Sequence, residues 1–351
     1  MKMIYVGSLS LSPDRDSGWV RAFRGLGLEV FPYSSEPCSL PQGILGRICR
    51  RLNFGKAFDA VEEGLLKTAR KNKPDWVHFR LPIEFSNRTI LELRKMDIVV
   101  TEYFNDDPFS KKNPLGLHWK FRRTLSAYDA HFVYRKKNID DFLNAGAKAV
   151  YHCAPTYDPS RHLLTERLPE GQFLADASFI GHWEADWREE CIVALLQEGF
   201  TVIVKGGLWE RENADPLLKK LYPIKPIFGQ KYNYIYANSV AGLCFFSKIN
   251  NDTWTERALE IIAVGGVLIC ERTSETQSYF KDGEEACFFS SIDELIRIVR
   301  FLKENPDRRE QIRASGYRRL ISDRHTIDDR AREIFSVVGE ITEKRIGKCA
   351  G

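Results

Sequence analysis

An arginine and a glutamate one helical turn apart, Arg257 and Glu260, form the most informative polar pair in the sequence. They follow Thr253 and Glu256, whose spacing matches the capping-box pattern and predicts a helix that begins near Trp254. A helix start favours a phosphate, because its N–H groups are unpaired and the helix dipole is positive there. A carboxylate one turn further along suits a pair of sugar hydroxyls. The pattern indicates a nucleotide site, although an exposed surface ion pair explains it equally well.

The residues around this pair predict a short helix between a loop and a buried strand. Leu259 and Ile262 recur at helical spacing and form an apolar face, which leaves Glu260 on a different side. Gly265 ends the helix, and the apolar run 267–270 suits a strand covered on both faces. These elements would hold the polar pair at the end of a parallel sheet.

Strands and helices alternate along the whole sequence, which is typical of α/β proteins with parallel sheets. We expect strands at residues 4–6, 29–32, 76–79, 98–101, 130–134, 149–154, 177–180, 201–204, 240–246, 267–270 and 286–289. We expect helices at residues 18–26, 58–71, 87–95, 120–125, 136–145, 187–197, 232–238, 254–264, 292–303, 306–322 and 327–344.

The chain length favours two domains, because single cores stop growing at roughly 250 to 300 residues. The polar segment 165–172 contains Pro169 and Gly171 and is the expected boundary. We therefore expect an N-terminal domain over 1–165, a second domain over 166–325 and a closing helix over 326–351. Two open α/β domains in tandem bind ligands beyond the carboxyl ends of their strands, so the cleft between them is the expected site.

The composition excludes several classes of protein. With 43% hydrophobic and 28% charged residues the chain is an ordinary globular protein, and no apolar run approaches the ~20 residues of a membrane helix. The start of the sequence enters a strand without a secretory pattern, so we expect a cytoplasmic protein. The eight Cys lack metal-ligand spacing, and the net charge of +4 is too small to predict nucleic-acid binding.

Five segments in the second half resemble the glycosyltransferases of GT-B architecture, in particular the group similar to the spore maturation protein CgeB. They are ASFIGHW (177–183) with Arg188, VKGGLW (204–209), YNY (232–234) with Ser239, TERALEIIAVGG (255–266) and FKDGEEACFF (280–289). Weaker likeness extends to residues 103–109, 128–134 and 146–162.

This resemblance implies two tandem Rossmann-like domains with a cleft between them and a C-terminal helix that crosses back to the first domain. It implies transfer of a sugar from a nucleotide-diphosphate sugar, with no bound metal or other cofactor, to a glycan, lipid-linked or protein acceptor. A nucleotide-sugar epimerase of the same fold is an alternative interpretation. A non-catalytic assembly protein that binds sugar nucleotides is another.

The resemblance also suggests roles for individual residues. Glu260 matches the acidic residue that holds the donor ribose, and Arg257 stands where a cation near the pyrophosphate is expected. Retaining enzymes of this architecture commonly carry a second glutamate ahead of Glu260, but Asp252 stands there, so inversion and retention both stay open. The other residues implied in donor binding are Gly181, Arg188, Lys205, Gly206, Tyr234, Thr255 and Glu256.

An inverting transfer needs a general base beside the attacking hydroxyl. Asp16, after the first strand, and Asp107, after a later strand, are the preferred candidates. Each has an alternative as a turn or helix cap. Weaker candidates are Asp14, Asp106, His78 and His118.

A basic amphipathic stretch covers residues 44–56, where Arg47, Arg50 and Arg51 alternate with apolar residues. Such a stretch can contact an anionic membrane surface or an acidic acceptor. A solvated helix face is the simpler explanation.

Overall fold

The computed structural model describes residues 1–9, 13–37, 42–113, 116–169 and 171–349. The chain forms two compact units, of which the first comprises Met1–Ala154 with Ile327–Gly351 and the second comprises Pro155–Thr326. The chain leaves the first unit after Ala154, earlier than the boundary expected at residue 165, and returns to it at Ile327.

The first unit is built on a six-stranded parallel sheet in the order β2-β1-β3-β4-β5-β6. Because β2 and β3 lie on opposite sides of β1, the strand order reverses beside β1, which is where open α/β sheets leave a crevice. The strands are β1 (Lys2–Gly7), β2 (Glu29–Ser34), β3 (Trp76–Arg80), β4 (Val99–Phe104), β5 (Ala130–Val133) and β6 (Val150–His152).

Helices cover both faces of this sheet, so its strands are apolar on both sides. One face packs against α3 and α4, and the other against α1 and α14. The helices are α1 (Pro13–Gly25), α2 (Gly43–Leu52), α3 (Lys56–Asn72), α4 (Asn87–Lys95), α5 (Trp119–Arg122), α6 (Lys137–Asn144) and α14 (Ile327–Cys349), with a short turn η1 (Leu125–Ala127).

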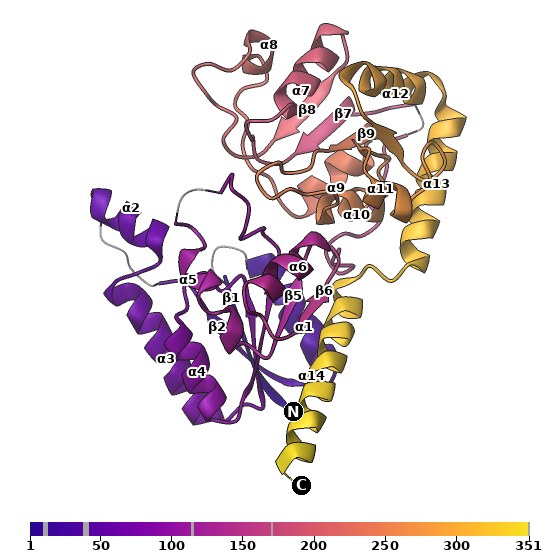
Figure 1. Cartoon of the computed structure of the whole chain (residues 1–351). Helices are drawn as coiled ribbons and strands as arrows, with labels where there is room; N and C mark the ends of the chain where they lie inside the picture. The colour runs from indigo at the N-terminus through magenta and orange to yellow at the C-terminus, as the bar shows by residue number, and fades with distance from the viewer. Residues whose placement is uncertain (10–12, 38–41, 114–115, 170, 350–351) are drawn as a thin grey trace. The chain divides into compact units, whose positions relative to one another are not determined.

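The last helix of the sequence belongs to the first unit. Ile334 and Val338 of α14 are fully buried in one core with Trp19 and Phe23 of α1. Figure 1 shows α14 running along this unit to the C-terminus.

The second unit carries a five-stranded parallel sheet in the order β11-β10-β9-β7-β8. Its strands are β7 (Ala175–Ile180), β8 (Val202–Lys205), β9 (Ser239–Cys244), β10 (Leu268–Glu271) and β11 (Cys287–Phe289). Its helices are α7 (Arg188–Gln197), α8 (Pro216–Lys219), α9 (Gln230–Ala237), α10 (Glu256–Ala263), α11 (Ser274–Tyr279), α12 (Ile292–Glu304) and α13 (Pro306–Ser322). One core lies under α7 and α12, and another lies under α9, α10 and α13.

The predicted α/β alternation is confirmed, with three local differences. The short helices α8 and α11 were not predicted, and α1 begins at Pro13 rather than at residue 18. The capping box predicted at Thr253 and Glu256 is wrong. The helix begins at Glu256 after the N-cap Thr255, and the Thr253 hydroxyl donates to Glu275 instead. No helix in the described part of the chain is long and apolar enough to cross a membrane.

Candidate functional site

The loops that follow β7 and β8 are in close backbone contact at the carboxyl ends of these strands. The Gly181 N–H donates to the Lys205 carbonyl (2.8 Å), and the Trp209 indole donates to the Gly181 carbonyl (2.7 Å). Gly206 has a φ of +143°, and a Cβ there would overlap the Gly181 carbonyl. Glycine is therefore required at Gly206 both by its backbone conformation and by the lack of space.

Arg257 lies in the first turn of α10 and reaches this pair of loops. A Cβ on Gly181 would stand 3.0 Å from the Arg257 Nη2, and the guanidinium carbon lies 5.4 Å from the centre of the Phe179 ring. The absence of a side chain at Gly181 thus lets the guanidinium approach the end of β7. The structure brings together Gly181, Lys205, Gly206 and Arg257 at one edge of the sheet.

The charge of Glu260 acts on Arg257 through space, but no carboxylate of the described residues forms a direct ion pair with it. Within the described ranges Arg257 forms no ion pair, and its buried Nε has no hydrogen-bond partner. Burial acts against the charged form, but nearby groups, among them Tyr236 and Glu260, raise the pKa of the guanidinium above its ordinary value. A half-buried arginine that stays charged and has no ion-pair partner among the described residues is suited to an anionic ligand.

Glu260 is held by two side chains that were not predicted to meet it. The Tyr232 hydroxyl donates to the Glu260 Oε2 (2.5 Å), and the His162 Nε2 lies 3.6 Å from Oε1. The backbone N–H of Asp158 donates to the His162 Nδ1 (3.3 Å), which places the ring proton on Nε2, facing Glu260. The Glu260 side chain is still 16% exposed, so a ligand can reach the carboxylate.

Tyr232 is the tyrosine that contacts Glu260, and the expected place of Tyr234 near a nucleotide stays a prediction. Tyr234 is 38% exposed, whereas Tyr236 is buried and accepts a hydrogen bond from the Ile180 N–H (2.9 Å). The spacing of Tyr232 and Tyr236 places both on one face of α9 and Tyr234 on another. That spacing was the signal in the sequence that could have favoured Tyr232.

Arg188 supports the loop after β7, and its role in binding a donor stays a prediction. It is 97% buried, its Nε and Nη2 each lie 2.7 Å from an Asp186 carboxylate oxygen, and its Nη1 donates to the His182 carbonyl (2.6 Å). Its described contacts fix residues 182–186 beside the predicted site.

The remaining predicted donor residues surround the start of α10. Thr255 is the N-cap, but its side chain makes no capping hydrogen bond. Asp252 and Glu256 are half-buried, and the Asp252 N–H donates to the Ser247 carbonyl (2.9 Å). Their roles in binding a donor stay predictions.

In the first unit, Asp16 is fully buried in the first turn of α1. Its Oδ1 accepts hydrogen bonds from the Tyr5 hydroxyl (2.6 Å) and the Arg80 Nη1 (3.4 Å), while its buried Oδ2 has no hydrogen-bond partner in the described part of the chain. Arg80 is the last residue of β3, so the pair joins two elements at the point where the strand order reverses. Asp16 stays a predicted base.

Asp107 is tightly bound within its own loop. Its carboxylate accepts hydrogen bonds from the Phe109 N–H (3.1 Å) and the Asn138 side chain (3.0 Å), and the Lys137 Nζ lies 2.7 Å from Oδ2. These contacts are those of a turn residue that anchors α6. They account for Asp107 without a catalytic role, and its role as a base stays a prediction.

The weaker histidine candidates are buried. Burial lowers the pKa of His78 to about 3, and its ring packs against Tyr5, Phe23 and Trp76, so it is a neutral core residue. Burial also lowers the pKa of His118. Asp106 is half-buried after β4, and the side chain of Asp14 lies outside the described residues.

Glu84 is an acidic residue that the sequence did not single out. It follows β3, and its buried Oε2 has no hydrogen-bond partner among the described residues. Burial, helped by the nearby Glu36, raises its pKa to about 8. Lys120 lies close by, but its ammonium donates to the Glu84 carbonyl and the Glu62 carboxylate instead. No periodicity or motif marks Glu84, because its environment is made by tertiary packing.

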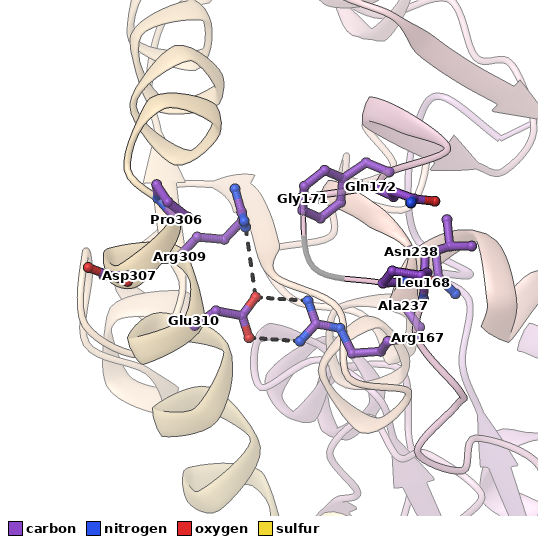
Figure 2. A pocket seen from close by; sticks show the side chains of 12 residues that line it. Arg167, Leu168, Gly171, Gln172, Ala237, Asn238, Pro306, Asp307, Arg309 and Glu310 are labelled. Carbon is purple, nitrogen blue, oxygen red and sulfur yellow. Dashed lines mark hydrogen bonds and ion pairs between the residues drawn. The ribbon is translucent and has the colours of Figure 1, made fainter.

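A cavity of about 280 Å³ lies elsewhere in the second unit (Figure 2). It includes Ala237 and Asn238, which directly precede β9, so it borders an amino end of the sheet. Figure 2 shows the paired side chains of Arg167 and Glu310 in its wall. None of the predicted donor residues lines this cavity.

Residues 188–336 match the model of a family described as glycosyl transferase-like. No curated protein matches the sequence. Among solved structures, the chain is similar to sucrose-phosphate synthase from Thermosynechococcus elongatus, with a TM-score of 0.69, 11% identity, and 98% of this chain and 100% of that chain covered.

Two further structures share the fold. Alr3699/HepE from Anabaena, solved in complex with UDP and glucose, gives a TM-score of 0.64 at 11% identity, with 97% of this chain and 100% of that chain covered. A structure assigned as UDP-N-acetylglucosamine 2-epimerase from Listeria monocytogenes gives a TM-score of 0.60 at 10% identity, with 98% of this chain and 97% of that chain covered.

The two parallel sheets, their covering helices and these similarities establish the architecture, although identities this low carry the fold alone. The chain therefore has the GT-B fold of two Rossmann-like domains, and its residues 188–336 are similar to the glycosyl transferase-like family.

Proposed function

We propose that this protein is a glycosyltransferase that moves a sugar from a nucleotide-diphosphate sugar to an acceptor. The observation that carries the proposal is Arg257, a half-buried cation without an ion-pair partner in the described residues, beside the glycine loops of β7 and β8. The match of residues 188–336 to a glycosyl transferase-like family supports the same conclusion.

The arrangement suits a leaving nucleoside diphosphate. As the glycosidic bond breaks, negative charge grows on the pyrophosphate, and a charged group already in place stabilises that state without reorganising. Arg257 and the N–H groups at the start of α10 would supply this stabilisation, and Glu260 would accept hydrogen bonds from the ribose hydroxyls. In this proposal no metal is needed, because the arginine and the helix start meet the phosphate charge. Among the described residues no cluster of His, Cys, Asp and Glu is grouped to hold one.

The acceptor side is proposed more broadly. A glycan, a lipid-linked molecule or a protein would present the attacking hydroxyl to the first unit, where Asp16, Asp107 and Glu84 are the carboxyl groups considered as bases. Kinship with the CgeB-like group is also part of the proposal and rests on the segments 177–183, 204–209 and 255–266.

A panel of UDP, GDP, TDP and CDP tests the donor site directly. We expect at least one nucleotide to raise the melting temperature of the wild-type protein, because a ligand that binds only the folded state stabilises it. Glu260→Ala and Arg257→Gln should each lower the affinity for that nucleotide by roughly 10-fold or more. This is the effect of losing a charge-assisted hydrogen bond.

The matched control is Glu190→Ala, which removes an exposed glutamate from α7 of the same unit. It should bind the nucleotide as the wild type does. If Glu260→Ala and Arg257→Gln also bind normally and keep their melting temperatures, the site is wrongly placed. If no nucleotide shifts the wild-type protein, a sugar-nucleotide function is refuted.

An epimerase is the second candidate, since the Listeria structure assigned as an epimerase shares the fold. The two reactions differ in their products. An epimerase forms an isomeric nucleotide sugar from the donor alone, whereas a transferase releases the nucleoside diphosphate. Proton nuclear magnetic resonance of the donor after incubation without acceptor distinguishes them, because an isomer has the mass of the donor but a different spectrum.

A further inference from the structure

The helix α2 and the two residues after it carry arginines but no acid. The sequence from Gly43 to Phe54 is GILGRICRRLNF, with Arg47, Arg50 and Arg51 exposed. Within the described residues, Arg47 and Arg50 form no ion pair. Two arginines without an ion pair among the described residues create a local positive surface.

Large apolar side chains share this surface. Ile44 is 70% exposed, Ile48 is 44% exposed and Phe54 is 45% exposed. Ile44 and Ile48 lie one turn apart, and Arg47 and Arg51 lie on the same side of the helix. We name the six exposed residues Ile44, Arg47, Ile48, Arg50, Arg51 and Phe54 the α2 face, with Arg50 beside Arg47 at its margin and Phe54 directly after the C-cap Asn53.

The opposite side of α2 is anchored to the first unit, so the α2 face is not needed for packing. Cys49 is 93% buried, and Asn53 is 96% buried in the left-handed conformation that ends the helix. The Trp119 indole donates to the Leu52 carbonyl (3.0 Å), and the Lys120 ammonium donates to the Asn53 carbonyl (3.2 Å). These contacts fix the orientation in which the face is presented, at the outer end of this unit in Figure 1.

We propose that the α2 face docks on the surface of an anionic phospholipid bilayer. The arginines complement the lipid phosphates and acidic headgroups, while the isoleucines and Phe54 enter the boundary between headgroups and acyl chains. An acidic protein would satisfy the arginines but would not account for apolar side chains interleaved with them. A lipid interface satisfies both.

This docking does not depend on the transfer reaction. If the transferase proposal also holds, docking favours the lipid-linked acceptor among the three classes, because it concentrates the enzyme where such acceptors lie.

The test is co-sedimentation of the full chain with vesicles of phosphatidylcholine alone or mixed with phosphatidylglycerol. We expect binding only to the mixed vesicles and a decline as salt rises, because salt screens the charges. Arg47→Glu/Arg50→Glu should lower vesicle binding by roughly 30-fold or more, and Ile44→Ser/Ile48→Ser by at least roughly 10-fold.

Two controls match these variants. Lys67→Glu/Arg70→Glu makes the same change of charge at the same spacing on exposed positions of α3, and Leu91→Ser/Leu143→Ser removes two other exposed apolar side chains. Both should bind vesicles as the wild type does, and far-ultraviolet circular dichroism checks that all variants fold. Absence of wild-type binding to anionic vesicles overturns the proposal, as does equal loss in the α2 variants and their controls. Because the assay contains no nucleotide, its outcome is separate from that of the nucleotide panel.

Discussion

At the scale of single residues, Arg257 and Glu260 share one helix but have opposite surroundings. Arg257 is a cation without an ion-pair partner in the described part of the chain, whereas Glu260 receives a hydrogen bond from the neutral Tyr232. An arginine that paired with Glu260 would have its charge neutralised before a ligand arrived. Keeping the two groups apart preserves a cation for phosphate and a carboxylate for hydroxyl groups.

Glu84 gives a prediction for the pH dependence of stability. Its pKa is raised from an ordinary 4.5 to about 8 in the folded protein, so the folded state holds a proton that the unfolded state has released between these values. Stability from this group is therefore complete below pH 4.5 and is lost as pH rises through about 8. The loss is at most about 1.4 kcal/mol per pH unit. Relative to Glu84→Gln, the wild type should become less stable between pH 5 and 8, measured by urea unfolding.

The control for Glu84→Gln is a carboxylate whose pKa lies below the range from pH 5 to 8. Glu92, also in the first unit, has its pKa lowered, first by a hydrogen bond from Lys95, so the difference in stability between the wild type and Glu92→Gln should stay constant in that range. A wild-type curve parallel to that of Glu84→Gln would show that Glu84 is ionised in the folded protein. Glu84 would then lose the raised pKa that sets it apart from the other carboxyl groups considered as bases.

Spacing in the sequence predicts which residues lie together on one helix, but not which residues from separate segments meet in the fold. Arg257 and Glu260 were visible because they lie on one helix and share a local pattern. His162 and Tyr232 come from separate segments and meet Glu260 only through folding, so no local spacing reveals them. Asp107 illustrates the converse, because its position after a strand suggested chemistry and its contacts are those of a turn.

At the scale of elements, the loop after β8 needs glycine at Gly206 for two reasons, its positive φ and the lack of space for a Cβ. Gly199, between α7 and β8, also has positive φ, but a Cβ there has nothing described within 4 Å, whereas one at Gly206 overlaps the Gly181 carbonyl. Gly199→Ala should cost only about 1 kcal/mol, the usual strain of a side chain at positive φ. Gly206→Ala should cost more and also weaken nucleotide binding, because it separates the two loops beside Arg257.

Thermal unfolding and the nucleotide shift assay measure both effects on the same samples. Equal stability and equal nucleotide binding in the two variants would mean that the close contact between Gly181 and Gly206 does not contribute to stability or binding.

The alternation of strands and helices could be predicted from apolar patterns. The contact between Gly181 and Gly206 could not, because it joins backbones from different strands. The start of α10 was misplaced for a related reason, since Thr253 bonds to Glu275 in another element instead of capping the helix.

At the scale of the whole molecule, the chain order and the folding units do not coincide. Residues 327–351 are last in the sequence but complete the core of the first unit. We expect two cooperative transitions on unfolding, since each unit has its own sheet and its own cores. A nucleotide that binds beside Arg257 should raise only the transition of the second unit.

Ile334 provides the variant that distinguishes the two transitions. It is fully buried in the core with Trp19 and Phe23, and Ile334→Ala should destabilise the first unit by about 2 to 5 kcal/mol through lost burial and a cavity. The exposed Ser336 lies on the same helix, and Ser336→Ala should change stability by no more than about 0.5 kcal/mol. Calorimetry of Ile334→Ala with and without the nucleotide should show a lowered first-unit transition beside an unchanged, nucleotide-sensitive one. A single transition that moves as a whole would show instead that the two units unfold together.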